Sequence, residues 1–396
     1  MNTESVISNE IKDAFFAVIS DTVFGSERSK AALSELTEDK LLSLYALAKK
    51  HDLAHLLADT VIKSAPSISP ALAQKLQKQK MMAIYRSQRI VHEQKRILDA
   101  LNTAKIPHIA LKGAFLRTLY PDAWMRTSCD IDVLVPQDSL DNAVSTLTEL
   151  LGYKTDGKPS FHDVHLYSES GVHLELHFSM LENSLALDKL LEKVWDHATP
   201  ASENSFEYKM SREFFVFHII AHASYHFTSG GCGVRTLIDL RILLQNLDFD
   251  ELRVRSFCAE CGIEKFYLSL CELSDARFSN AKHSPLSEKL ENYILLGGTY
   301  GSKPNSVAVG SIKKGGKLKY AFSRIILPYA SLSMLYPSLK KHKWLFPFFQ
   351  VRRWFSILLS KRLRSAVNDL SCAATLSKEK SAEVSALLNE LDLRLK

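Results

Sequence analysis

Two acidic residues stand close together in the stretch "RTSCDIDVLV", residues 126–135. Asp130 and Asp132 are separated by one apolar residue and followed by three more. Residues i and i+2 of a strand face the same side, so both carboxylates would project together from the start of a buried strand. Two carboxylates this close repel each other unless a cation lies between them or one is protonated. Hard divalent ions such as magnesium favour such oxygen ligands and keep waters for a phosphate-bearing substrate.

A third carboxylate occurs in "HLELHF", residues 173–178. Glu175 is in the middle of this predicted strand, with leucines on the opposite face. If the strand lies beside the "DIDVLV" strand, Asp130, Asp132 and Glu175 converge. Three converging carboxylates are a ligand set for two metal ions that drive an in-line displacement at a phosphorus centre.

The segment "IPHIALKG", residues 106–113, could bind the phosphates of such a substrate. Lys112 and Gly113 end a predicted strand and lead directly into a helix. Free backbone amides at the helix start, a glycine without a side chain and the Lys112 ammonium together suit a phosphate chain. Arg126 lies four residues before Asp130 and could bind the same anion through two hydrogen bonds.

These segments carry a family resemblance. "IPHIALKGAFLRTLYPDAWMRTSCDIDVLV" followed by "HLELHF" resembles the nucleotidyltransferase-fold proteins of the polymerase-beta superfamily. More narrowly, it is similar to an uncharacterised bacterial nucleotidyltransferase family with the motif L-K-G, R-x-x-x-D-[IV]-D and E-L-H. The likeness continues through "HIIAHASYHFTSGGCGVRTLIDL" into the C-terminal region. It implies transfer of a nucleoside monophosphate from a nucleoside triphosphate such as ATP to a hydroxyl of a small molecule, glycan or lipid-linked intermediate. The implied cofactor is magnesium, with manganese as an alternative.

The resemblance also assigns roles by motif position. It implies that Asp130 and Asp132 are the paired metal ligands and that Glu175 is the third carboxylate. One feature departs from the superfamily, whose phosphate loop usually reads Gly-Ser or Gly-Gly, because here an alanine follows Gly113. The absent serine hydroxyl leaves open a nucleotide-binding or regulatory protein that has lost turnover.

The hydrophobic periodicity predicts an α+β (mixed) fold, with a small mixed sheet and flanking helices embedded in a mostly helical chain. The resemblance implies that this sheet is of the nucleotidyltransferase type. Residues 1–103 are predicted to be helical, and 104–200 to form the α/β core with a hairpin around Gly171. Residues 201–300 are predicted to be a helical domain. Residues 301–396 form the last region, which is predicted to begin within a loop, "GTYGSKPNSVAVGSIKKGGK", and to continue as basic, aromatic-rich helices.

Several histidines allow a second interpretation of the strand region. His173, Glu175 and His177 share one strand face and could hold a single zinc or iron ion, although this leaves the aspartate pair unexplained. His165 and His177 are candidates for the acceptor side of the site, and the alternative is that they are ordinary hydrogen-bonded sheet histidines.

A histidine row follows in the helical region. His218, His222 and His226 recur every four residues, so they could hold a metal ion or mark a helix that packs against a polar neighbour. Arg235 and Asp239 are also four apart and are predicted to pair along their helix. Alternatively, Arg235 reaches the substrate from the helical domain.

The C-terminal region is basic. The chain has a formal net charge of +6, and 13 Lys or Arg but no Asp or Glu lie between Lys313 and Arg364. Such a segment suits an anionic membrane surface. It also suits nucleic acid, as in an RNA-modifying nucleotidyltransferase. The third interpretation is a packed helix with a solvated basic side. The interleaved aromatic residues are Trp344, Phe346, Phe348, Phe349, Trp354 and Phe355.

The remaining features concern location. The start "MNTESVISNEIKDAFF" has acids where a signal peptide is basic, which favours a cytoplasmic protein with reduced thiols. Cys258 and Cys261 form a C-x-x-C without a second pair, which disfavours a zinc ribbon. The longest uncharged apolar stretch, residues 325–339, contains two prolines and is too short to span a membrane, so no transmembrane span is expected.

Overall fold

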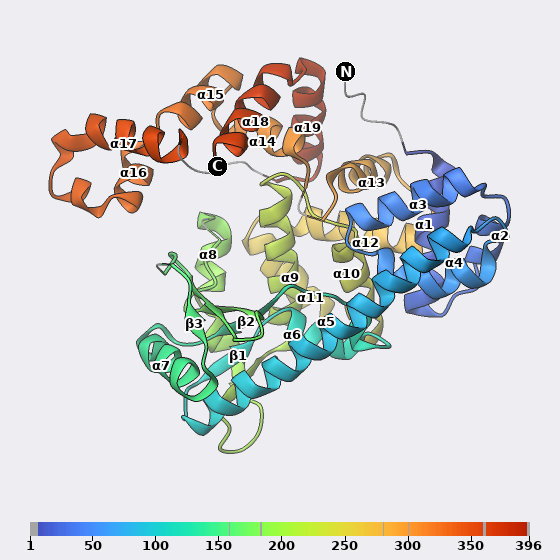
Figure 1. Ribbon diagram of the computed structural model, residues 1–396, viewed down its shortest axis with the longest axis horizontal. Helices are drawn as coiled ribbons and strands as arrows, with labels where there is room; N and C mark the ends of the chain where they lie inside the picture. The colour runs from blue at the N-terminus through green and yellow to red at the C-terminus, as the bar shows by residue number, and fades with distance from the viewer. Residues whose placement is uncertain are drawn as a thin grey trace.

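The fold is of the α+β mixed class, as predicted (Figure 1). In the described part of the chain, one seven-stranded sheet follows an N-terminal group of helices in the sequence and precedes a longer C-terminal series of helices. The computed structural model describes residues 7–157, 159–182, 184–279, 281–299, 301–358 and 362–393.

The N-terminal helices are joined to the sheet by one long helix. The helices are α1 (Asn9–Phe24), α2 (Ser29–Ser34), α3 (Glu38–Lys50), α4 (Ala58–Ser64) and the long α5 (Pro70–Thr103). α5 begins where the Ser69 side chain accepts a hydrogen bond from the backbone N–H of Leu72 and where proline fills the first helical position. Leu72 packs with the N-terminal helices, whereas Ile97 and Leu101 pack under the sheet, so α5 spans both regions.

The sheet has the order β3-β4-β5-β2-β1-β7-β6. β2 pairs with β5 and β1 with β7 in parallel, and the other neighbours are antiparallel. The predicted hairpin around Gly171 is confirmed, with this glycine at a φ of 80°. The sequence pattern did not predict β6 and β7. The strands are β1 (His108–Ala110), β2 (Asp130–Leu134), β3 (Lys154–Thr155), β4 (Asp163–Tyr167), β5 (His173–His177), β6 (Ala198–Pro200) and β7 (Glu207–Met210).

The strands β2, β4 and β5 have one apolar face. Ile131, Val133, Leu174 and Leu176 point to the side covered by α5 and α7 (Leu140–Leu151), where they form a buried core. Because side chains alternate along a strand, the acidic and histidine residues of the same strands project from the opposite face. α6 (Gly113–Leu119) connects β1 to β2 and lies beside that polar face.

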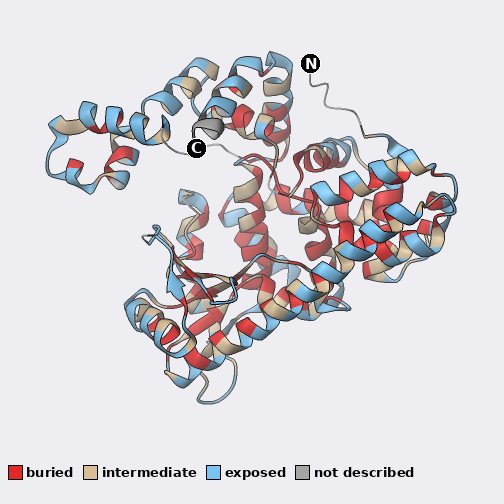
Figure 2. Ribbon diagram, in the orientation of Figure 1, coloured by how far each residue is buried: buried red, intermediate tan, exposed pale blue. Residues whose placement is uncertain are grey.

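A second helical group follows the sheet in the sequence, and its helix α9 (Arg212–Phe227) faces the polar side of the sheet. The group comprises α8 (Leu185–Leu191), α9, α10 (Arg235–Asn246), α11 (Glu251–Glu260), α12 (Glu264–Phe278) and α13 (Pro285–Gly297). α9 is largely buried, as its mostly red ribbon in Figure 2 shows, because Phe214, Phe217 and Phe227 pack into the main core. This burial holds the histidine row of α9 in a defined position.

The loop predicted for "GTYGSKPNSVAVGSIKKGGK" is wrong over most of its length, because α14 (Lys303–Lys313) forms there. Ser302 caps the helix and proline occupies its first turn. Its small apolar residues Val307, Ala308 and Val309 are buried, since α18 (Arg362–Thr375) and α19 (Lys378–Glu390) pack closely against α14. The remaining C-terminal helices are α15 (Lys317–Ile325), α16 (Tyr329–Leu335) and α17 (Phe346–Leu358).

Two further features bear on the expectations about location. Among the described residues, no helix has both the length and the apolar character needed to cross a membrane. Cys258 and Cys261 are free thiols, and burial raises the pKa of Cys258 and of its C-x-x-C partner Cys261, the latter to about 12.

Candidate active site

The three predicted carboxylates lie together on neighbouring strands. In the parallel β2–β5 pair, Asp132 is the direct register partner of Glu175, and Asp130 lies two residues earlier on the same face. Burial, together with repulsion from Asp132 and Glu175, raises the pKa of Asp130 above its usual range. The predicted side-by-side arrangement of these strands is therefore confirmed.

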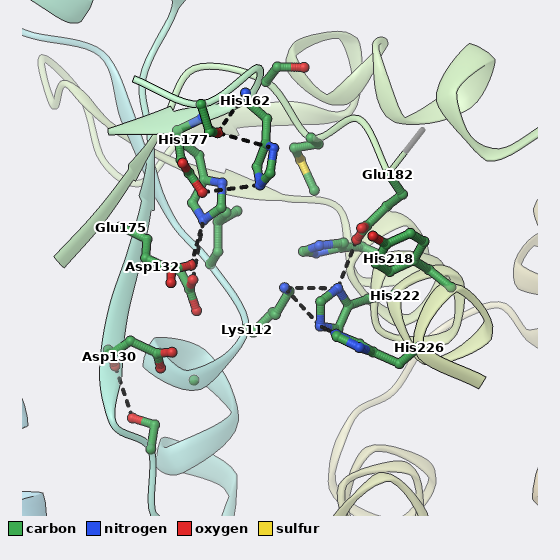
Figure 3. Close-up of a pocket in the computed structure, with 18 of the residues that line it drawn as sticks. Lys112, Asp130, Asp132, His162, Glu175, His177, Glu182, His218, His222 and His226 are labelled. Carbon is green, nitrogen blue, oxygen red and sulfur yellow. Dashed lines mark hydrogen bonds and ion pairs between the residues drawn. The ribbon is translucent and has the colours of Figure 1, made fainter. Parts of the chain in front are cut away.

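These carboxylates line one wall of a cleft of about 520 Å³. Figure 3 shows Asp130, Asp132 and Glu175 on the strand side, with Glu182 and the α9 histidines across the cleft and Lys112 between the two walls. All the residues predicted for the site line this cleft: Lys112, Gly113, Arg126, Asp130, Asp132, His165, Glu175, His177 and Arg235.

His177 supports the carboxylate cluster. Its Nε2 lies 3.2 Å from Oδ1 of Asp132 and 3.6 Å from Oε2 of Glu175. Burial alone would lower the pKa of His177, but the hydrogen bonds with these two carboxylates raise it to about 9. Burial alone would also raise the pKa of Asp132, yet His177 and Lys112 bring it well below its usual range. The ionised form of Asp132 is thus stabilised, whereas that of Asp130 is not.

Lys112 occupies a strained position at the start of α6. Its φ of 23° and ψ of −89° are unusual for a residue with a side chain, and such strain concentrates at functional sites. Its Nζ lies 3.0 Å from Nδ1 and 3.2 Å from Nε2 of His222 on α9. Lys112 therefore connects the sheet to the helical wall of the cleft.

The histidine row of α9 packs against this lysine. Nδ1 of His222 lies 2.8 Å from Oε1 of Glu182, and Nε2 of His226 lies 2.9 Å from Nε2 of His222. Burial and then the Lys112 charge lower the pKa values of His218, His222 and His226. The row therefore has polar neighbours in Lys112 and Glu182, and in the described part of the chain its three histidines do not form one of the potential metal-binding groups.

Arg126 is held by a buried carboxylate. Its Nε and Nη2 donate to Asp239 at 2.8 and 3.0 Å, and the hydroxyl of Tyr120 donates to the same carboxylate at 2.7 Å. Nη1 points toward Gly113, where an added Cβ would lie 3.1 Å from it and 3.0 Å from Nη1 of Arg117. A side chain at Gly113 would therefore press on two guanidinium groups at the start of α6.

The predicted pairing of Arg235 with Asp239 is wrong. Arg235 instead donates to Oδ2 of Asp52 at 3.0 Å and to Thr127 at 3.2 Å. Asp239 accepts its hydrogen bonds from Arg126 rather than from Arg235. Helical spacing permits an i,i+4 pair, but the buried guanidinium from a different element competes for the same carboxylate. Arg235 still lines the cleft.

We expect Asp239→Ala to destabilise the protein strongly. The change leaves the buried Arg126 without its bidentate partner, which costs about 3–5 kcal/mol. Asp275→Ala is the control, because Asp275 pairs with Arg241 at a partly exposed site, where loss of a pair costs about 0–1 kcal/mol. Urea unfolding measures both. Equal losses in the two variants would contradict a structural role of the Arg126–Asp239 pair.

The remaining sheet histidines form separate groups. Nδ1 of His165 lies 2.9 Å from Nε2 of His173, and both residues approach Glu175 at 3.9 Å. In the described part of the chain, His173 and His177 fall in different potential metal-binding groups. The interpretation in which both bind one zinc or iron ion with Glu175 is therefore not supported.

The donor set fits a divalent metal ion. Ligand atoms of Asp132, Glu175 and His177 lie within 4.8 Å of one another, and the two carboxylates are the oxygen donors of this group, with His177 as their hydrogen-bonding partner. The raised pKa of Asp130 marks a concentration of negative charge that a divalent cation would relieve. Carboxylate oxygens are also the ligands that magnesium and manganese prefer.

Two contacts at the cleft were missed from the sequence. Glu182 follows β5 and holds His222, and Arg117 is buried behind the carboxylates, where its Nη1 donates to Oγ of Ser128 at 2.9 Å. Burial lowers the pKa of Arg117 to about 10. A basic residue on the inner face of α6 was the available signal for Arg117. Glu182 had none, since it lies outside any regular element.

The resemblance implies paired metal-ligand aspartates and a third carboxylate, and the structure has these three residues together on β2 and β5 of a mixed sheet. The chain belongs to the uncharacterised nucleotidyltransferase family, which it matches over residues 38–279, more than half of its length. Comparisons with curated proteins and with solved structures give no match. Membership of the family points to transferase activity, and nucleotidyltransferases generally use divalent metal ions.

Proposed function

We propose that this protein is a magnesium-dependent enzyme that transfers a nucleoside monophosphate from a nucleoside triphosphate to a hydroxyl of an acceptor. The acceptor is a small molecule, a glycan or a lipid-linked intermediate. The observation that carries the proposal is the register pairing of Asp132 with Glu175, with Asp130 beside them on the cleft wall.

In the proposed reaction the acceptor oxygen attacks the α-phosphorus of the donor. A new P–O bond forms, the bond to the β-phosphate oxygen breaks, pyrophosphate leaves, and the hydroxyl proton passes to solvent. Asp130, Asp132 and Glu175 would hold the metal ions, which when bound polarise the phosphoryl oxygens and neutralise developing charge. His177 keeps Asp132 ionised and oriented for this role.

The donor phosphates are proposed to lie at the start of α6. The ammonium of Lys112 and Gly113 both line the cleft, and Nη1 of Arg126 lies beside Gly113, where it adds a second positive charge for the phosphate chain. A bound phosphate would compete with His222 for Lys112. His165, His177 and Arg235 remain the candidates for the acceptor side, and of these Arg235 comes from the helical wall.

Titration calorimetry with non-hydrolysable triphosphates tests donor binding directly. We expect binding in the presence of magnesium or manganese and little binding with EDTA, because the carboxylates repel the phosphates when no cation is present. In the Asp132→Asn variant, binding of the triphosphate should no longer depend on magnesium or manganese. Absence of binding to every triphosphate in magnesium would contradict the proposal.

A binding protein without turnover is the second candidate. It is favoured by Ala114, which stands where the superfamily loop carries a serine, and by the contact that already engages Lys112 with His222. Such a protein would bind the triphosphate with magnesium but release no pyrophosphate with any acceptor fraction. Pyrophosphate release therefore separates the two candidates.

A further inference from the structure

The basic C-terminal region exposes apolar side chains at helical spacing. On α17, Phe348, Val351, Phe355 and Leu358 are 59, 54, 61 and 53% exposed. Their intervals of three, four and three residues place them on one stripe of the helix. A helix of a globular protein normally turns such a stripe toward the core, whereas α17 turns it toward solvent.

α15 has a second stripe of the same kind. Leu318, Phe322 and Ile325, spaced by four and three residues, are 87, 60 and 39% exposed. Trp344, just before α17, is 78% exposed. Figure 2 shows α15 and α17 mostly in pale blue, and Figure 1 shows α16 and α17 projecting at one end of the molecule. A packed helix with a solvated basic side therefore describes these two helices only in part, because both also expose apolar side chains.

Cations accompany the apolar stripes. Lys319 and Arg324 on α15 and Arg352 on α17 are exposed, and the segment from Lys313 to Arg364 contains no acidic residue. An apolar stripe bordered by cations is the pattern of a helix that lies in the interface of an anionic membrane. There the apolar face enters the headgroup boundary while the cations contact the lipid phosphates.

We propose that the exposed faces of α15 and α17 form a docking surface for an anionic lipid bilayer. Nucleic acid fits less well, because bases stack on aromatic side chains and leave Leu318, Val351 and Leu358 without a role. A second copy of the chain fits less well too, since it would bring two basic segments together without an acidic residue in either. This docking surface does not depend on the proposed nucleotidyl transfer.

Vesicle flotation tests the proposal on the full chain. Vesicles of phosphatidylcholine alone are compared with vesicles of equal parts phosphatidylcholine and phosphatidylglycerol. We expect binding to the anionic vesicles that weakens as salt is added and little binding to the neutral ones. The variant Phe348→Ser/Phe355→Ser should reduce binding about tenfold, because two exposed rings no longer enter the lipid. Leu252→Ser is the matched control, since Leu252 is 74% exposed on α11.

A charge variant tests the contribution of the cations to the docking surface. Lys319→Glu should reduce binding to anionic vesicles at least about fivefold, the effect of one cation near such a surface. Lys265→Glu makes the same change of net charge at an exposed position on α12 and should leave binding unchanged.

Three outcomes would overturn the proposal. One is equal binding to neutral and anionic vesicles, or binding to neither. The second is loss of RNA binding in Phe348→Ser/Phe355→Ser without any vesicle binding by the wild type, which would indicate a nucleic-acid surface. The third is a wild-type dimer that this variant converts to a monomer, again without vesicle binding, which would indicate self-association.

Discussion

Asp130→Asn and Asp132→Asn are expected to abolish transfer but to change stability in opposite directions. Each removes a carboxylate of the proposed metal site, so each should lower the rate of label incorporation by about a hundredfold or more. Their stabilities differ because the pKa of Asp130 is raised in the folded protein whereas that of Asp132 is lowered. Simple repulsion between two carboxylates would predict that either substitution stabilises the metal-free protein.

The sign of each effect follows from linkage between ionisation and folding. When the pKa of a carboxylate is raised in the folded protein, its ionisation at neutral pH lowers the free energy of unfolding. Asp130→Asn removes this ionised group, so it should raise the melting temperature in EDTA. A carboxylate with a lowered folded pKa adds stability above its unfolded pKa of about 3.9, and that stability is lost as pH falls through the folded value. Asp132→Asn should therefore destabilise by about 1.5–3 kcal/mol, the range for a hydrogen bond to a charged group such as the one with His177.

Thermal melting in EDTA and then in magnesium measures both effects. Magnesium should stabilise the wild type and should stabilise the two variants less, because each has lost a ligand. Destabilisation of equal size by both substitutions in EDTA would contradict the assignment of His177 and Lys112 as partners of Asp132. Full activity in either variant would remove that aspartate from the proposed metal site.

The second large effect separates donor binding from chemistry. Lys112→Ala should raise KM for the triphosphate, with a smaller loss of kcat, because a contact between an ammonium and a phosphate exists before transfer as well as during it. The loss in kcat/KM should correspond to about 1.5–3 kcal/mol. Glu175→Gln should mainly lower kcat, because a metal ligand acts most strongly as charge develops in the transition state.

Lys209→Ala is the control for Lys112, because Lys209 is an exposed lysine of the same sheet that does not line the cleft. Its kinetic constants should match those of the wild type. An equal fall of kcat in Lys112→Ala and Glu175→Gln with unchanged KM would make Lys112 a transition-state residue. No effect of Lys112→Ala would mean that the donor phosphates lie elsewhere.

The strand wall of the cleft could be predicted because its signals are local. Alternating polar and apolar residues specify which face Asp130, Asp132 and Glu175 share, and the buried leucines specify the other face. The convergence of the three carboxylates was predicted only on the condition that β2 and β5 are neighbours, because no local sequence feature determines which strands pair. The register of Asp132 with Glu175 meets that condition.

The helical wall could not be predicted in the same way. Lys112 and His222 are separated by 110 residues, and their contact depends on how α9 packs across the sheet. Asp239 illustrates the same limit, because helical spacing favours Arg235 as its partner while the tertiary fold supplies Arg126. α14 was missed because its buried residues are small, and a helix of this kind depends on close packing by its neighbours.

The most direct test of the central claim is a comparison of donor label positions. The protein is incubated with magnesium, cell extract and triphosphate labelled either at the α-phosphate or at the γ-phosphate, with Asp130→Asn as the inactive control. Nucleotidyl transfer predicts that the α label appears on an acceptor while the γ label leaves as pyrophosphate. Transfer of the γ label to the acceptor would indicate a phosphoryl transferase, and α labelling that persists in Asp130→Asn would contradict the assigned site.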